Sequence, residues 1–150
     1  MPAWGSVRKA GQIAKWLHGP WLEHYVLDII KRLPSDLHIN DIGQSISPKG
    51  IATFEVDVVA MQGYRMFAFS VTTDVSDLNK LKLFEAVERA QQMGVVEAHV
   101  ALVTFSEKAA QLQRQVAEVW GDRHRSRIRV FGLSQLPNLD QHLEAWFKEN

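Results

Sequence analysis

The 150-residue chain contains no cysteine, which excludes a disulfide framework and any metal site built from thiolates. It also has no net charge, because 17 basic residues balance 17 acidic ones. The overall charge therefore gives no indication of a nucleic-acid or membrane partner. No apolar run is long enough to span a membrane, and residues 1–9 lack the apolar segment of a signal peptide. These absences predict a cytoplasmic protein without a membrane partner.

Short motifs for cofactors are absent as well. The chain has no Walker loop, no dinucleotide glycine fingerprint, no Gly-x-Ser-x-Gly turn and no metal-binding spacing among its six histidines. We therefore expect no nucleotide cofactor. What the chain does have is 46% hydrophobic and 23% charged residues, which is ordinary for a globular protein. With this length, the composition predicts a single domain over 1–150.

The pattern of apolar residues predicts alternating helices and strands. Apolar residues at three- and four-residue spacing indicate helices, and β-branched runs between turn residues indicate strands. The predicted helices cover 7–18, 21–33, 77–93, 106–120 and 139–147, and the predicted strands cover 37–46, 51–61, 64–73, 99–105 and 128–131. The order ααβββαβαβα predicts an α/β fold with a mixed central sheet and helices on both faces.

One acid lies in an unusual place, in the apolar strand at 54–60. Asp57 is surrounded by β-branched residues, and a charge buried there needs a partner or a metal. Because strand side chains alternate, Asp57 shares a face with Glu55. This pattern is consistent with a role for Asp57 as a ligand of Mg²⁺. It is equally consistent with a face of the sheet that is simply less buried.

The strand that follows offers no second acid. Ser70 and Thr72 share one of its faces, and their hydroxyls supply neither the countercharge of a metal nor an ammonium group. Glu23, in the first turn of the helix at 21–33, complements the helix dipole, or it joins Asp57 at a metal.

Two charged clusters complete the candidate residues. On the helix at 77–93, Glu85 and Arg89 have the spacing of an exposed ion pair, while Lys82 or Glu85 could instead reach toward Asp57. Near the C-terminus, four arginines are packed into seven residues, and this cluster forms either a weak phosphate-contact site or a solvated loop. Its members are Arg123, Arg125, Arg127 and Arg129.

Taken together, these motifs resemble the PD-(D/E)xK superfamily of restriction-endonuclease-like nucleases. The similarity is greatest to the nuclease domain of the CARF-fused ancillary nucleases of type III CRISPR systems, and it covers residues 12–105. The residues that carry it are a Trp-Leu-Glu turn at 19–23, an acidic strand at 54–58, a second strand at 69–73, a helix at 78–94 and a strand at 98–103.

The resemblance implies a three-layer α/β/α sandwich and a homodimer, and it also implies where the site has changed. The metal-binding Glu of the family falls on Ser70 and its catalytic Lys on Thr72, so Glu23 and Asp57 are the remnant of the catalytic and metal-binding set. The acids that remain are Glu23, Glu55 and Asp57, which are few for a site that holds Mg²⁺ or Mn²⁺. Such an ion is expected only if the site is active.

We therefore expect a nuclease-fold domain with a degenerate active site that binds DNA, RNA or protein without cleaving it, in a CRISPR or defence context implied by the resemblance. An active metal-dependent endonuclease with Lys82 and Glu85 as relocated catalytic residues is the alternative. A purely structural interaction module is the third possibility.

Overall fold

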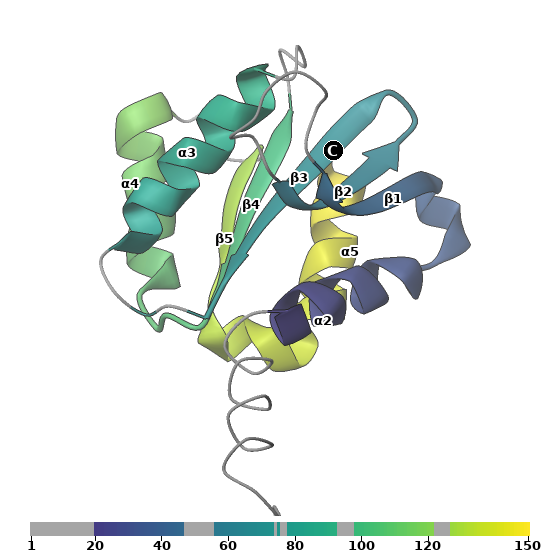
Figure 1. The fold of residues 1–150 in the computed structure, drawn as a ribbon, viewed down its shortest axis with the longest axis horizontal. Helices are drawn as coiled ribbons and strands as arrows, with labels where there is room; N and C mark the ends of the chain where they lie inside the picture. Colours follow the sequence, from purple (N-terminus) through teal and green to yellow (C-terminus); the bar gives the residue numbers. More distant parts are fainter. Residues whose placement is uncertain (1–19, 47–55, 74, 76–77, 93–97, 122–126) are drawn as a thin grey trace, which may run out of the picture.

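The computed structural model describes residues 20–46, 56–73, 75, 78–92, 98–121 and 127–150 (Figure 1). Five strands form one sheet in the order β1-β2-β3-β4-β5. They are β1 (Ile39–Ile46), β2 (Val56–Gln62), β3 (Arg65–Thr72), β4 (His99–Thr104) and β5 (Ile128–Phe131). The pairs β1-β2 and β2-β3 are antiparallel, and the pairs β3-β4 and β4-β5 are parallel. The α/β class with a mixed sheet is therefore confirmed.

Within the described residues, four α-helices flank this sheet: α2 (Pro20–Lys31), α3 (Leu78–Gln92), α4 (Ala109–Trp120) and α5 (Leu139–Glu149). The two crossover helices, α3 and α4, lie on one face, and α2 and α5 lie on the other (Figure 1). The predicted helix at 7–18 and the start of the predicted strand at 51–61 lie outside the described residues.

Several predicted boundaries were shifted by local backbone chemistry. A short 3₁₀ turn over Ser35–Leu37 comes before β1, and His38 has a φ of 57°, so the strand begins only at Ile39. Likewise α4 begins at Ala109 rather than Ser106, because the Ser106 hydroxyl accepts the Lys108 N–H at 3.1 Å in a turn ahead of the helix. By contrast, β5 has the predicted bounds.

The first core lies between the sheet and the pair α2 and α5. Its centre is Trp146, only 2% exposed, whose ring is perpendicular to those of Phe67 and Phe69 at centroid distances of 5.0 and 5.7 Å. The side chains packed around it are apolar and come from α2, β2, β3 and α5. They include Leu22, Val26, Ile30, Val58, Ala60, Val71, Leu139, Leu143 and Phe147.

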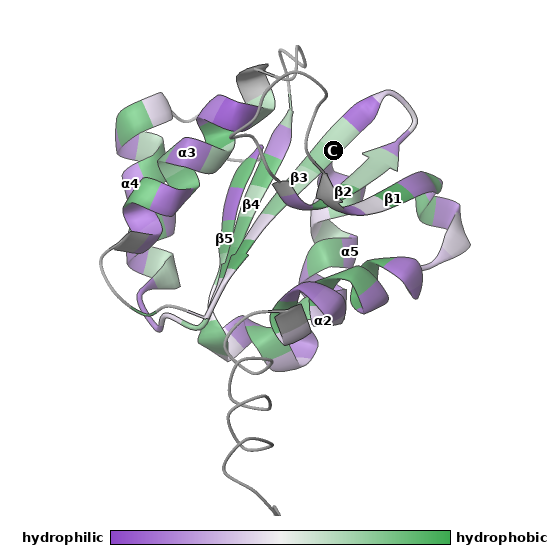
Figure 2. Cartoon of the chain, viewed as in Figure 1, coloured by the Kyte–Doolittle hydropathy of each residue, from purple (hydrophilic) through white to green (hydrophobic). Residues whose placement is uncertain are grey.

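The second core lies between the sheet and the pair α3 and α4. All six residues of β4 are buried, as expected for a strand covered on both faces. The apolar side chains that the sheet and helices contribute to this face include Val59, Met66, Ala68, Leu83, Val87, Ala90, Val100, Leu102 and Val116. Figure 2 shows these strands as largely hydrophobic between the flanking helices.

On the side of β5 away from β4, the backbone is hydrogen-bonded to a side chain of α4. Gln113 of α4 donates its amide to the carbonyl of Ile128 at 2.8 Å and accepts the N–H of Val130 at 2.7 Å. Both backbone groups flank Arg129, so one amide satisfies the two polar groups that this stretch of edge strand leaves open. No helix in the described part of the chain is long and apolar enough to cross a membrane.

A buried histidine links β4 to the end of α5. His99 is 6% exposed, stacks on Phe67 at 4.4 Å and lies with its Nε2 atom 2.9 Å from the Asn150 side-chain oxygen. Burial lowers the pKa of this imidazole from its usual value of 6.5, and the positive charges of Arg127 and Arg65 act in the same direction, while the bond to Asn150 opposes them.

We expect Trp146→Ala to destabilise the fold by about 3–5 kcal/mol, because it removes the largest fully buried side chain of the described residues and leaves a cavity. Urea unfolding followed by circular dichroism measures this loss. Val119→Ala is the matched control, since Val119 is 52% exposed, and its effect should stay within about 0.5 kcal/mol. Equal effects of the two substitutions would contradict the placement of the core.

We expect stability to fall as the pH drops from 7 through 6.5 toward the lowered folded-state pKa of His99. In that window the unfolded chain binds a proton at this imidazole that the folded chain does not, so acid favours unfolding. Below the folded-state pKa the loss levels off. His99→Phe should remove this part of the pH dependence, whereas substitution of the exposed His24 by Phe should leave it in place. Melting temperatures between pH 5 and 7.5 measure both, and an unchanged profile in His99→Phe would refute the assignment.

Candidate functional site

Asp57 and Lys82, two of the predicted charged residues, meet where β2 and β3 separate. The last residues in register between the two strands on this side are Val58 and Phe69. One step further, the Asp57 carboxylate takes the place of a strand partner and its Oδ2 atom accepts the N–H of Val71 at 2.7 Å. The acid therefore satisfies a backbone donor that β2 no longer reaches.

The carbonyl group of Val71 is bound by Lys82 of α3. The Lys82 ammonium donates to this carbonyl at 2.9 Å. The N–H and C=O of one strand residue point toward the same edge of the strand, as they do when a residue exchanges both bonds with a partner. Asp57 and Lys82 thus lie on the β2 side of Val71, one on each of its backbone groups. We call this arrangement the β2-β3 fork.

Ser70 and Thr72 flank Val71 in the sequence, and both are half-buried. They alternate with Val71, which is part of the first core, so they face the second core and the α3 side. The structure therefore brings Asp57, Ser70, Thr72 and Lys82 to one place. In this set, one carboxylate and one ammonium are the only charged groups.

Glu23 approaches the sheet from the other side. Its Oε2 atom accepts a long hydrogen bond of 3.5 Å from Gln44, and Gln44 stands opposite Val58, a first-core residue. Asp57 alternates with Val58 and so belongs to the second-core face. An ion shared by Glu23 and Asp57 would have to lie at the open end of the fork, between the two faces. Glu55 lies outside the described residues.

Glu85 is exposed and makes its ion pair with a residue of its own helix. It pairs with Arg89 at 3.7 Å, one turn along α3, and 47% of its side chain is exposed. The ion pair expected from the spacing is therefore present, and an exposed pair of this kind contributes less than about 1 kcal/mol. Among the described residues, no group of three or more histidines, aspartates or glutamates is arranged to hold a metal ion.

The arginine cluster is described only in part, since Arg123 and Arg125 lie outside the described residues. Arg129 pairs with Glu149 at 2.6 Å and so ties β5 to α5. Arg127 is half-buried beside β4, and its backbone carbonyl accepts the N–H of Val100 at 2.7 Å. The contact of this cluster with phosphates stays a prediction.

The sequence reading missed a buried polar pair close to the fork. Thr104, at the end of β4, stands opposite Thr72 and donates its hydroxyl to Asn79 of α3 at 3.1 Å. Asn79 and Thr104 are 6% and 0% exposed. An asparagine one position into a helix gives no signal of burial, because this residue type is mostly exposed.

Comparisons with known proteins give a fold likeness and nothing closer. No family model and no curated protein matches the chain. Among solved structures, the crystal structure of protein VC1899 from Vibrio cholerae is similar, with a TM-score of 0.71 and 20% sequence identity. The match covers 89% of this chain but 35% of that protein, so the chain spans about a third of its relative's length. At this identity the likeness concerns the fold alone.

We expect Asp57 and Lys82 to act as a coupled pair in stability. Asp57→Ala leaves the buried N–H of Val71 without its acceptor and should cost about 1–3 kcal/mol. Lys82→Met removes one donor to the Val71 carbonyl and should cost about 0.5–1.5 kcal/mol. In the double variant we expect a coupling energy of at least about 0.5 kcal/mol. Urea unfolding of the four proteins completes the cycle, and strictly additive losses would show that the two groups act separately.

Proposed function

We propose that this chain is a restriction-endonuclease-like domain, built as a three-layer α/β/α sandwich, that binds nucleic acid without cleaving it. The observation that carries the proposal is the β2-β3 fork, where Asp57 and Lys82 are both bonded to the backbone of Val71. The similarity of the motifs to the PD-(D/E)xK superfamily supports the assignment of the fold. The homodimer and the CRISPR context rest on that resemblance alone.

The loss of catalysis follows from the composition of the fork. A nuclease of this kind needs several carboxylate oxygens to hold Mg²⁺ or Mn²⁺, and the ion then activates water and stabilises charge on the phosphate. Here Ser70 and Thr72 stand where the resemblance places an acid and a lysine. The one carboxylate, that of Asp57, already accepts the N–H of Val71.

Binding without cleavage remains within reach of the same residues. A lysine ammonium has three donors, and the bond to the Val71 carbonyl uses one of them, so two are left for a phosphate oxygen. Lys80 on the same helix and Lys108 ahead of α4 add two exposed positive charges on this face of the sheet. Phosphate contacts of this type give affinity that depends on salt and little on sequence.

One observation favours the second candidate, an active nuclease with a relocated lysine. Lys82 comes from α3, yet its ammonium lies beside the strand position where the resemblance expects the catalytic lysine. In this version Asp57 and Glu23 supply the metal ligands from the two sides of the fork, and Mg²⁺ or Mn²⁺ is required.

We expect no cleavage of single- or double-stranded DNA or RNA by the protein in the presence of Mn²⁺, and we expect a mobility shift that weakens steeply as salt is raised. Lys82→Met should lower the slope of log affinity against log salt by about one. Lys31 is an exposed residue of α2, on the other face of the sheet from Lys82. Lys31→Met is therefore the matched control and should leave the slope unchanged.

Asp57→Asn and Asp57→Ala complete the cleavage assay, the first because it keeps a side-chain oxygen for Val71. Cleavage by the wild type that disappears in both variants would overturn the non-catalytic proposal in favour of the relocated site. If the protein neither cuts nor shifts any nucleic acid, the nucleic-acid proposal fails and an interaction module remains.

A further inference from the structure

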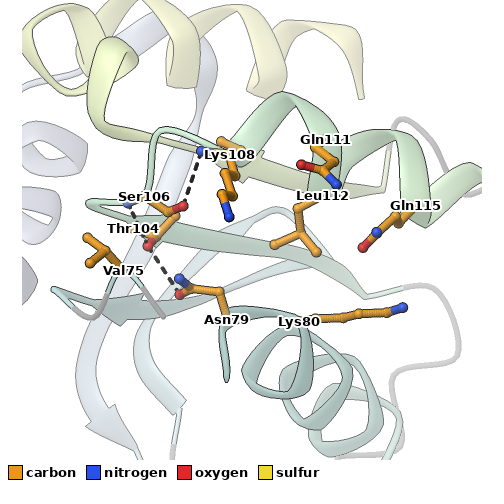
Figure 3. A pocket seen from close by; sticks show the side chains of 10 residues that line it. Val75, Asn79, Lys80, Thr104, Ser106, Lys108, Gln111, Leu112 and Gln115 are labelled. Atoms are coloured by element: carbon orange, nitrogen blue, oxygen red, sulfur yellow. Dashed lines mark hydrogen bonds between the residues drawn. The ribbon is translucent and has the colours of Figure 1, made fainter. Parts of the chain in front are cut away.

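A cavity of about 250 Å³ opens between the first turns of α3 and α4, beside the end of β4 (Figure 3). Its walls include Val75, Asn79, Thr104, Ser106, Lys108 and Leu112. Neither the fork residues Asp57, Val71 and Lys82 nor the flanking Ser70 and Thr72 line it. The cavity nevertheless adjoins the fork, and it shares Lys80 and Lys108 with the surface proposed for nucleic acid.

Three of the lining side chains are polar and more than nine-tenths buried: Asn79, Thr104 and Ser106 are 6%, 0% and 7% exposed. The Thr104 hydroxyl donates to Asn79 and accepts the Ser106 N–H, and each of these bonds is 3.1 Å long. The Ser106 hydroxyl accepts the Lys108 N–H at 3.1 Å. That last bond uses a lone pair of the Ser106 oxygen and leaves its proton to be donated.

Among the described residues, the charge on the cavity wall is positive only. Lys80 and Lys108 line the cavity, and no acidic residue of the described part of the chain does, although the exposed Glu107 is next to Lys108 in the sequence. Within the described part of the chain, neither lysine forms an ion pair. In Figure 3 the Lys108 side chain points into the space between Ser106, Asn79 and Leu112. A ligand there meets an ammonium and a hydroxyl donor together, which suits an anion with several acceptor oxygens.

The volume of the cavity and its apolar wall residues restrict the class of ligand that fits it. The cavity is smaller than the roughly 300–1,000 Å³ of pockets for drug-sized molecules. Val75, which Figure 3 shows near Thr104 and Ser106, and Leu112 add apolar groups to the wall. We propose that it binds the phosphate monoester of a pentose, with the phosphate at Lys108 and Ser106 and the sugar against Val75 and Leu112. The ligand is either a free sugar phosphate or the phosphorylated end of a nucleic-acid strand.

Calorimetric titration of the whole chain with ribose 5-phosphate tests this proposal, with inorganic phosphate as the comparison. We expect saturable binding of ribose 5-phosphate and weaker binding of phosphate alone, because phosphate cannot use the apolar wall. Lys108→Ala should weaken the binding of ribose 5-phosphate by about tenfold or more, since it removes a charge-assisted hydrogen bond. Lys31→Ala, an exposed lysine on the other face, should bind like the wild type.

Ser106→Ala is the second variant, and the melting temperature of each variant shows that it is folded. A folded Ser106→Ala that also loses affinity supports the proposal. Equal affinity for phosphate and ribose 5-phosphate, an absence of saturable binding, or affinity unchanged in both variants would overturn it.

Two oligonucleotides that differ only in a 5′-phosphate or a 5′-hydroxyl then identify the source of the ligand. Tighter binding of the phosphorylated strand, competed by ribose 5-phosphate, assigns the cavity to strand ends. Equal binding of the two strands, with ribose 5-phosphate still bound, assigns it to a free sugar phosphate. The calorimetric result does not depend on the mobility shift, so the proposals for the cavity and the fork can fail independently.

Discussion

The end of β3 sets the strongest constraint on this molecule, because a buried strand there loses one neighbour and keeps the other. β3 remains paired with β4 through Val71 and Thr72, while its register with β2 ends at Phe69. The backbone groups of Val71 on the β2 side must still find partners, since an unpaired polar group in a buried strand is costly. Asp57 and Lys82 provide them, and α3 must pack so that Lys82 reaches across.

This requirement connects the fold to the chemistry proposed for it. In a strand that ended with an acid and a lysine of its own, the charges of the site would belong to β3. Here β3 offers Ser70 and Thr72, and its neighbours supply one charge each. The side chains of Asp57 and Lys82 therefore stabilise the place where β2 and β3 separate. They also determine which ligands could approach that place. A ligand at the fork would have to share both groups with the peptide backbone.

The sequence predicted the elements better than the contacts between them. The bounds of β5 were predicted to the residue, because a short apolar strand between polar turns is a local signal. The face of α3 that packs against the sheet was harder to predict. Leu81 is 55% exposed while Leu83 is buried, since the face that a helix presents depends on the sheet against which it packs. The position of Asp57 was evident, but its bond to Val71 was not, because the bond depends on where β2 and β3 separate.

The two hydrogen bonds that Gln113 makes to the backbone of β5 affect how this domain can bind other chains. An amide that donates to Ile128 and accepts from Val130 makes the two bonds that another polypeptide would make if it were to extend the sheet. Growth of the sheet at this border must first displace the glutamine, and the backbone of β5 is therefore shielded from β-type aggregation. Partners that extend the sheet by adding a strand are directed to the opposite border, where β1 is the last strand of the described residues.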